Sequence, residues 1–175
     1  SLPSKMRAAI TIDGDDVVEC DYGTLHPKIL YLEHGAELPG DAYDILEEKN
    51  DRNARIAVKR AFNAMVNASR PLMRAPSKLD IKRTGLTWRD LSQRILEKHH
   101  AIEDAFYSGQ GLRLQHIDSQ LAERVMLYFT SKDVPVLPVH DSFIIAAQHQ
   151  QELVAVMKRV FGERFGGADI KVTVK

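Results

Sequence analysis

Two apolar segments of the sequence each end in an aspartate. The first runs over residues 17–20 into Asp21, and the second runs over residues 134–140 into Asp141. Strand ends hold side chains rigidly, and carboxylate oxygens are the hard ligands that divalent metal ions prefer. Two such acids, brought together from distant parts of the chain, would form a metal site for phosphoryl transfer. Alternatively, each Asp simply begins a turn after a buried strand.

The composition is that of a globular protein and excludes several other classes. The 175 residues are enough for one domain with a substantial core. No apolar run approaches the roughly 20 residues that span a bilayer, so we expect no membrane partner. A single cysteine, Cys20, excludes an internal disulfide framework and favours a reducing, cytoplasmic location. The sequence does not begin with Met, so further domains of a longer parent protein stay open as partners.

Charge is distributed unevenly, although the formal net charge is zero. Residues 13–51 hold 12 acids and 2 bases, whereas residues 52–98 hold 12 bases and 3 acids. One interpretation is that two solvated faces attract each other. The other is that a metal-binding acidic part lies beside a phosphate-binding basic part. Charge alone does not choose between these interpretations.

The hydrophobic pattern predicts strands and helices in the order of an α+β domain. A favoured Asp-Gly turn between β-branched segments predicts a hairpin over residues 9–20. Residues 134–146 predict a second hairpin with Asp141 at or near its tip. Apolar periodicity predicts helices over 25–34, 53–69, 87–106, 112–129 and 150–165, and a strand over 170–174. We therefore expect a mainly antiparallel sheet with helices on one face.

The residues around Asp141 resemble a known polymerase motif. Segment 138–143, PVHDSF, is similar to the last motif of family A (polymerase I-like) DNA polymerases and of the single-subunit RNA polymerases. The Ser after the Asp is closer to the RNA-polymerase form, because polymerase I enzymes usually have Glu there. A match of this length is a weak signal by itself, but three further segments match the family in the same order.

The segment 21–30, DYGTLHPKIL, resembles the first motif of the family, whose DNA-polymerase form reads DYSQIELRI. The resemblance implies that Asp21 and Asp141 are the catalytic acids. They would bind two Mg²⁺ or Mn²⁺ ions, with Tyr22 as an extra metal ligand through its carbonyl and as a contact to the nucleotide. His26 falls where the family has a Glu that excludes ribose, so the usual preference for deoxynucleotides does not carry over. Alternatively, His26 is only a polar residue at a helix start.

A basic helix resembles the nucleotide-binding helix of the family's fingers. Arg55, Lys59, Asn63 and Asn67 are spaced four apart and so share one face, separate from an apolar stripe that includes Ile56. In the family, the Arg and Lys bind the incoming triphosphate, an aromatic residue occupies the Asn63 position, and Tyr-Gly begins at Asn67. The aromatics and the Gly are missing here. The resemblance implies nucleotide contacts from Arg55, Lys59 and Asn63, whereas the plain alternative is a solvated basic face.

Other residues are candidate contacts to nucleic acid. Gln115 begins a helix similar to the family's Gln-Gly helix, whose Gln touches primer–template, and Arg7 matches an Arg upstream of the first motif. His140 and Arg70 are further candidates, although His140 is also interpreted as a packed residue that orients its hairpin. Backbone phosphates are expected to meet the basic connection after the fingers-like helix, which also contains Arg74, Lys78, Lys82 and Arg83.

One adjacent pair of histidines is not predicted to bind a metal ion. His99 and His100 lie near the end of a predicted helical turn. No Cys or further His lies at metal-ligand spacing, so a surface pair is favoured over a zinc site.

The resemblance covers nearly the whole chain and implies one polymerase-like domain, with a palm over 1–34 and 112–175 and a reduced fingers-like insertion over 35–111. The implied function is template-directed nucleotidyl transfer, nearest to that of a DNA polymerase, on a DNA or RNA primer–template with nucleoside triphosphates. Two-metal phosphoryl transfer mainly needs positioning and charge neutralisation. The alternatives are an inactive polymerase-like module that binds nucleic acid or a partner protein, and another metal-dependent phosphotransfer enzyme such as a nuclease.

Overall fold

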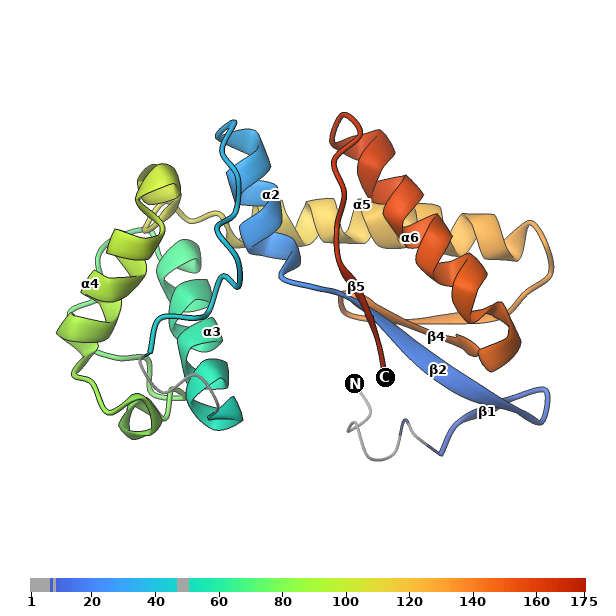
Figure 1. Cartoon of the computed structure of the whole chain (residues 1–175), viewed down its shortest axis with the longest axis horizontal. Helices are drawn as coiled ribbons and strands as arrows, with labels where there is room; N and C mark the ends of the chain where they lie inside the picture. Colours follow the sequence, from blue (N-terminus) through green and yellow to red (C-terminus); the bar gives the residue numbers. More distant parts are fainter. Residues whose placement is uncertain (1–6, 8, 47–50) are drawn as a thin grey trace. The chain divides into compact units, whose positions relative to one another are not determined.

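The computed structural model describes Arg7 and residues 9–46 and 51–175. The chain divides into two compact units, and Figure 1 labels most of their helices and strands. We call them the sheet unit, Ser1–Leu25 with His116–Lys175, and the helical unit, His26–Gln115. The assignment of parts of the chain as palm and fingers stays a prediction. No helix in the described ranges is long and apolar enough to cross a lipid bilayer.

Within the described residues, the sheet unit is built on five strands whose neighbours pair antiparallel. The central strand, β2 (Asp15–Tyr22), pairs with β4 (Ser142–Ala146), which in turn pairs with β3 (Val136–Val139). On the edge that does not face β4, the start of β2 pairs with β1 (Thr11–Ile12) and the end of β2 pairs with β5 (Val172–Val174). The α+β class and the antiparallel sheet predicted from the sequence are confirmed.

Both predicted hairpins are present, and each closes through a two-residue turn. Asp13 (φ 53°) and Gly14 (φ 87°) are both left-handed, as the favoured Asp-Gly hairpin turn requires. In the β3–β4 hairpin, the turn residues are His140, with φ 56°, and Asp141. Asp141 therefore lies at the hairpin tip, as expected from the sequence.

Two α-helices in the described part of the chain accompany the sheet. α6 (Gln150–Arg164), preceded by the short η3 (Ala147–His149), packs against β2, β4 and β5. The part of α5 (Gly111–Thr130) that belongs to the sheet unit lies beside α6 on the same side of the sheet (Figure 1). Burying each large apolar side chain stabilises the fold by about 1.5–3 kcal/mol. The buried set includes Cys20, Phe143, Ile145, Leu121, Val125, Phe129, Leu153, Met157 and Phe161.

The helical unit packs its helices around an aromatic cluster. Its elements are α2 (Leu25–Glu33), α3 (Arg52–Asn67), η1 (Ile81–Thr84), α4 (Trp88–Lys98) and η2 (His100–Ala105), with Leu25 itself assigned to the sheet unit. α3 begins at a carboxylate cap, because Asp51 accepts hydrogen bonds from the N–H groups of Asn53 and Ala54 at 2.7 and 3.2 Å. The ring of Phe62 on α3 is fully buried and lies 5.3 Å from that of Phe106.

His99 is at the centre of this cluster, so its interpretation as a surface residue is wrong. Its side chain is fully buried, with the ring 5.0 Å from Phe62, whereas His100 is exposed. Nε2 donates to the carbonyl of Ala42 at 2.8 Å, and Nδ1 accepts from the Tyr31 hydroxyl at 2.9 Å. Nε2 carries the proton of the neutral ring, because a carbonyl oxygen can only accept a hydrogen bond. Both ring nitrogens are satisfied, which allows a histidine to replace an apolar core residue.

Two further expectations are corrected in the helical unit. The predicted helix over 87–106 is interrupted at His99, where φ is −106° and ψ is 30°, and continues as the short η2. Ile56, which the sequence placed in the apolar stripe of α3, is 39% exposed. The buried face of α3 is instead formed by Ala54, Ala57, Val58, Ala61, Phe62, Met65 and Val66.

Candidate functional site

Asp21 and Asp141 come from neighbouring strands of the sheet unit. Asp21 lies near the end of β2, opposite Ser142, the first residue of β4. The N–H of Tyr22 donates to the carbonyl of Asp141 at 3.1 Å, which fastens the hairpin tip to the end of β2. Both aspartates are partly exposed. Backbone pairing therefore brings together two acids that are far apart in the sequence.

A lysine ammonium contacts Asp21. Lys175 follows β5, and its Nζ lies 2.9 Å from Oδ2 of Asp21 and 3.8 Å from Oε1 of Glu19. The Lys175 backbone is fixed by two bonds to Glu19, donating from N at 2.9 Å and accepting at O at 3.2 Å. The Lys175 side chain is 53% exposed and that of Asp21 is 25% exposed. An oxygen of Asp21 that solvent can reach therefore already binds a cation.

Glu19 connects a second cation to the hairpin that carries Asp141. Arg7 donates from Nε and Nη2 to the two carboxylate oxygens of Glu19, at 3.0 and 3.2 Å. The Ser142 hydroxyl is 2.8 Å from Oε1 of Glu19 and 2.9 Å from the carbonyl of Val139. Arg7, a candidate primer–template contact from the sequence, is therefore bound to Glu19, and this network holds the start of β4. Sequence reasoning did not find Glu19 or Lys175, because neither pairing is local.

Asp118 on α5 is a third acid near the hairpin tip, and sequence reasoning missed it. Burial, followed by the carboxylate of Asp141, raises the pKa of Asp118 to about 6, with His140 acting in the opposite direction. The sequence did contain a signal. Asp118 lies four residues after the buried Leu114 and three before the buried Leu121, on the inward stripe of α5. A carboxylate on such a stripe is costly, which makes Asp118 a candidate functional residue.

Tyr22 and Cys20 point their side chains away from solvent. The Tyr22 ring packs against Phe143 and Phe161, and its hydroxyl donates to the carbonyl of Met157 at 2.8 Å. A contact from Tyr22 to a metal ion or nucleotide would therefore come from its backbone. Burial, and then the charge of Glu19, raise the pKa of Cys20 to about 11. The thiol stays protonated at neutral pH and is not a nucleophile.

His140 precedes Asp141 in a backbone conformation that most residues avoid. Its φ of 56° is left-handed, a region in which His is enriched among non-glycine residues but which still costs about 1–3 kcal/mol. The residue is exposed, so its interpretation as a packed residue is wrong. Its candidate contact to nucleic acid stays a prediction. Backbone strain of this kind persists where the surrounding structure fixes the path of the chain, and here it sets the path into Asp141.

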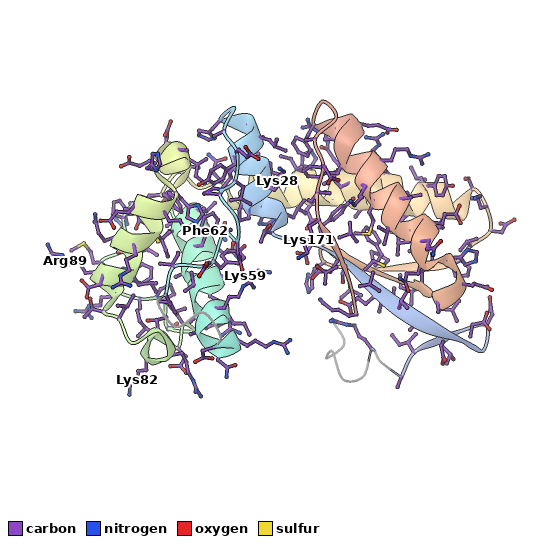
Figure 2. The ribbon with its side chains drawn as sticks, viewed as in Figure 1. Lys28, Lys59, Phe62, Lys82, Arg89 and Lys171 are labelled. Carbon is purple, nitrogen blue, oxygen red and sulfur yellow. The ribbon has the colours of Figure 1, made fainter. Side chains whose placement is uncertain are left out.

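The cations predicted to bind triphosphate lie on an exposed face of α3. Arg55 donates from Nε and Nη2 to the Asp41 carboxylate at 2.8 and 2.9 Å, with its guanidinium 5.1 Å from the Tyr43 ring centroid. Burial opposes ionisation of Asp41, but hydrogen bonds from Arg55 and Tyr43 outweigh it and lower the pKa of Asp41. Lys59, one turn later, points away from the unit, whereas Phe62 is buried inside it (Figure 2).

Other sequence-derived candidates of the helical unit are dispersed. Asn63 is partly buried one turn after Lys59, and His26 is partly buried in the first turn of α2. Gln115 on α5 and Arg70, beyond the end of α3, are exposed. The structure brings Arg55, Lys59 and Asn63 together on one helix, whereas Asp21, Asp141 and Arg7 belong to the sheet unit. The ligand roles of all these residues stay predictions.

The donors of the sheet unit fit a hard divalent cation such as Mg²⁺. One carboxylate, Asp21, lies on β2, and the other, Asp141, lies in the turn that precedes β4, the strand paired with β2. Oδ2 of Asp21 already holds the Lys175 ammonium as a stand-in cation. Among the described residues, no group of three or more His, Cys, Asp and Glu side chains is arranged to hold a metal ion. Mg²⁺ does not need one, because it is usually bound by one or two carboxylates and completed by water and phosphate oxygens.

Comparison with known proteins identifies the fold but no sequence relative. No protein-family model matches the sequence, and no curated protein matches it. Among solved structures, the chain is similar to the POL domain of Pol1 from M. smegmatis, in complex with DNA primer-template and dNTP. The TM-score is 0.54 at 10% sequence identity, and the match covers 94% of this chain and 40% of the Pol1 chain. The chain thus has the fold of a family A polymerase domain over 40% of that structure's length.

Proposed function

We propose that this chain catalyses template-directed nucleotidyl transfer, in the manner of a DNA polymerase. The observation that carries the proposal is the strand pairing that sets the hairpin tip with Asp141 against the end of β2 with Asp21. Its weight comes from the fold, because the same chain is similar to a polymerase domain over nearly its whole length.

In this proposal Asp21 and Asp141, with the Tyr22 carbonyl, would hold two Mg²⁺ or Mn²⁺ ions. Bound there, the ions would supply the positive charge that stabilises both the attacking and the leaving oxygen. The primer 3′-hydroxyl would give its proton to solvent and form a bond to the α-phosphorus of a nucleoside triphosphate. The bond from the α-phosphorus to the oxygen it shares with the β-phosphorus would break, and that oxygen would leave with pyrophosphate. Asp118 would add a second negative charge near Asp141. Two like charges repel each other unless a cation compensates them, so Asp118 would favour cation binding there.

The helical unit would supply the triphosphate contacts. Arg55 already presents its guanidinium to a carboxylate in a bidentate geometry, and a phosphate can replace that carboxylate with the same two donors. Lys59 adds a point charge one turn away, while Asn63 and His26 would contact the base and sugar. DNA or RNA primer–template would be bound by Gln115, Arg70, His140 and, after release from Glu19, Arg7.

The test is extension of a labelled primer on a template, with Mg²⁺ or Mn²⁺ and nucleoside triphosphates. We expect the wild-type chain to extend the primer and to release one pyrophosphate per nucleotide, which a nuclease would not do. Asp141→Ala should lose both activities. Asp169→Ala is the matched control, because it removes another acid, 79% exposed and paired with Lys158. Equal background in all three proteins would refute the proposal.

A second candidate function is binding without turnover. The internal ion pairs favour it, because Lys175 neutralises Asp21 and Asp41 neutralises Arg55 at the two places where ligands are expected. Such a module would bind primer–template with an affinity that falls steeply with salt. It would bind equally well as wild type and as Asp141→Ala, and neither protein would incorporate nucleotides.

A further inference from the structure

We infer that Lys175 is a resident counter-ion of Asp21, which a divalent metal ion must displace, and that Lys175 thereby sets the metal concentration that the acid site needs. The inference rests on the proposed function, because it takes Asp21 as a metal ligand. It adds a residue that neither the motif pattern nor the fold comparison indicates.

The geometry commits Lys175 to Asp21. The Lys175 backbone is paired with Glu19 in both directions, so the start of the side chain cannot drift along the sheet edge. Its Nζ is closer to Asp21, at 2.9 Å, than to Glu19, at 3.8 Å. Both oxygens of Glu19 already accept hydrogen bonds from Arg7, so the charge of Glu19 is compensated without Lys175. The ammonium therefore serves mainly the carboxylate that is proposed to bind metal.

An ammonium and a divalent ion cannot share an oxygen of Asp21 without repulsion. Lysine carries a compact point charge on a flexible stem, so it can leave when a stronger ligand arrives. The Lys175 side chain is 53% exposed, so it has room to turn into solvent. The attraction between opposite unit charges about 4 Å apart in water corresponds to about a fivefold change in an equilibrium constant. We therefore expect competition from Lys175 to weaken metal binding by about fivefold.

A purely structural ion pair would behave differently. Exposed pairs contribute roughly 0–1 kcal/mol to stability. If Lys175 only ties the end of β5 to β2, its removal would lower stability and leave metal affinity unchanged. If Lys175 competes with metal ions, its removal would instead lower the stability of the metal-free protein and raise its affinity for metal.

The experiment measures Mn²⁺ binding to the full chain by the electron paramagnetic resonance signal of the free ion. Lys175→Met removes the charge and keeps a flexible side chain of similar length, and Lys175→Arg keeps the charge. Lys158→Met, on α6, is the matched control, because it makes the same charge change at a lysine whose Nζ lies 3.3 Å from Oδ1 of Asp169. Asp21→Asn identifies which binding event belongs to Asp21.

We expect Lys175→Met to bind Mn²⁺ about fivefold more tightly than wild type, with Lys175→Arg and Lys158→Met within twofold of wild type. Thermal unfolding supplies a second readout. Lys175→Met should melt at a lower temperature than wild type without metal and should gain more from saturating Mn²⁺, because a ligand stabilises the folded state according to its affinity.

Two negative results are distinguishable. If Asp21→Asn weakens Mn²⁺ binding while Lys175→Met binds as wild type or more weakly, the counter-ion inference is wrong and the metal role of Asp21 stands. If wild type and Asp21→Asn bind Mn²⁺ equally, the metal part of the proposed function fails, and the inference fails with it.

Discussion

The acids of the sheet unit and the cations of the helical unit are held in place by different means. Asp21 and Asp141 lie at the ends of paired strands, where backbone hydrogen bonds fix their positions. Arg55 stands on an exposed helix face, where one carboxylate, Asp41, holds its guanidinium. Backbone pairing defines a position, whereas a side-chain pair leaves a group able to exchange its partner. In the proposed function, the rigidly placed acids would hold metal ions, and the exchangeable Arg55 would bind a ligand that enters and leaves.

The electrostatic surroundings of the acids also differ within the sheet unit. Asp21 contacts the Lys175 ammonium, whereas Asp141 lies near another acid, Asp118. One carboxylate is compensated by the protein itself, and the other adds to a local excess of negative charge. The difference suggests that a bound cation would gain most at Asp141 and would compete most at Asp21.

The largest expected effect concerns the packing that supports the cation face. Phe62→Ala should lower the free energy of unfolding by about 3–5 kcal/mol, because the fully buried ring leaves a cavity beneath α3. Unfolding in denaturant measures this loss of stability. Met73→Ala is the control, because the Met73 side chain is 92% exposed and its removal leaves no cavity. A loss below about 1 kcal/mol for Phe62→Ala would mean that the cluster repacks and does not anchor α3.

The next effect tests whether the α3 cations meet triphosphate. Arg55→Met should raise KM for the nucleoside triphosphate about tenfold or more and change kcat much less, because charge-assisted hydrogen bonds contribute about 1.5–3 kcal/mol to binding. Lys59→Met should act in the same direction. Arg89→Met, on α4 and extending away from the unit, is the control (Figure 2). Equal KM values in all three would leave α3 as a solvated basic face.

The buried histidine makes the stability of the helical unit depend on pH in the opposite direction from Asp118 in the sheet unit. Burial, only partly offset by the bond to Ala42, lowers the pKa of His99 below that of an unfolded histidine. As pH falls below about 6.5, the unfolded chain gains a proton that the folded chain refuses, so stability falls by up to about 1.4 kcal/mol per pH unit. Unfolding between pH 7.5 and 5 measures the slope.

The control for that slope is the neighbouring exposed residue. His100→Gln should keep the wild-type dependence on pH, whereas His99→Gln should be less stable at pH 7.5 and show a shallower slope. A slope that is the same in wild type and His99→Gln would contradict the buried neutral histidine.

The smallest effect concerns the acid beside Asp141. The pKa of Asp118, about 6 in the folded chain, lies above the usual value near 3.9. Its ionisation therefore costs stability above pH 6, and this cost disappears as pH falls towards 4. Asp118→Asn should raise the melting temperature at pH 7 by roughly 2–4 °C or less, since the group is partly exposed. Stabilisation that is the same at pH 4 and pH 7 would show that charge is not the cause.

The sequence predicted those parts of the fold that depend on local chemistry. The Asp13–Gly14 turn, the apolar runs before Asp21 and Asp141, and the periodicity of α5 were enough to predict two hairpins, a helix and acids at strand ends. A turn and an amphipathic period are properties of neighbouring residues, so they can be read without the partner surface. The pairing of β2 with β4 joins distant segments and was not predicted; the resemblance to the polymerase family implied only that Asp21 and Asp141 come together.

Contacts that join distant residues could not be predicted. Lys175 meets Asp21 only because β5, from the far end of the sequence, pairs with β2. Arg7 precedes β1 and meets Glu19 on β2, the strand with which β1 pairs. His99 has the residue type of a surface position, yet its two hydrogen-bond partners come from other segments of the helical unit. Burial of a polar group depends on such partners, and a sequence pattern does not display them.

If Asp21 and Asp141 share one metal site, as proposed, both carboxylates must bind the same ion. The most direct test is a crystal structure of the full chain with Mn²⁺ and a non-hydrolysable nucleoside triphosphate, using the anomalous signal to locate the ion. We expect Mn²⁺ bonded to carboxylate oxygens of both residues and to the triphosphate, with the Lys175 ammonium moved off Asp21. Ions that bind neither carboxylate, or carboxylates that bind no common ion, would show that the two acids do not form a shared metal site.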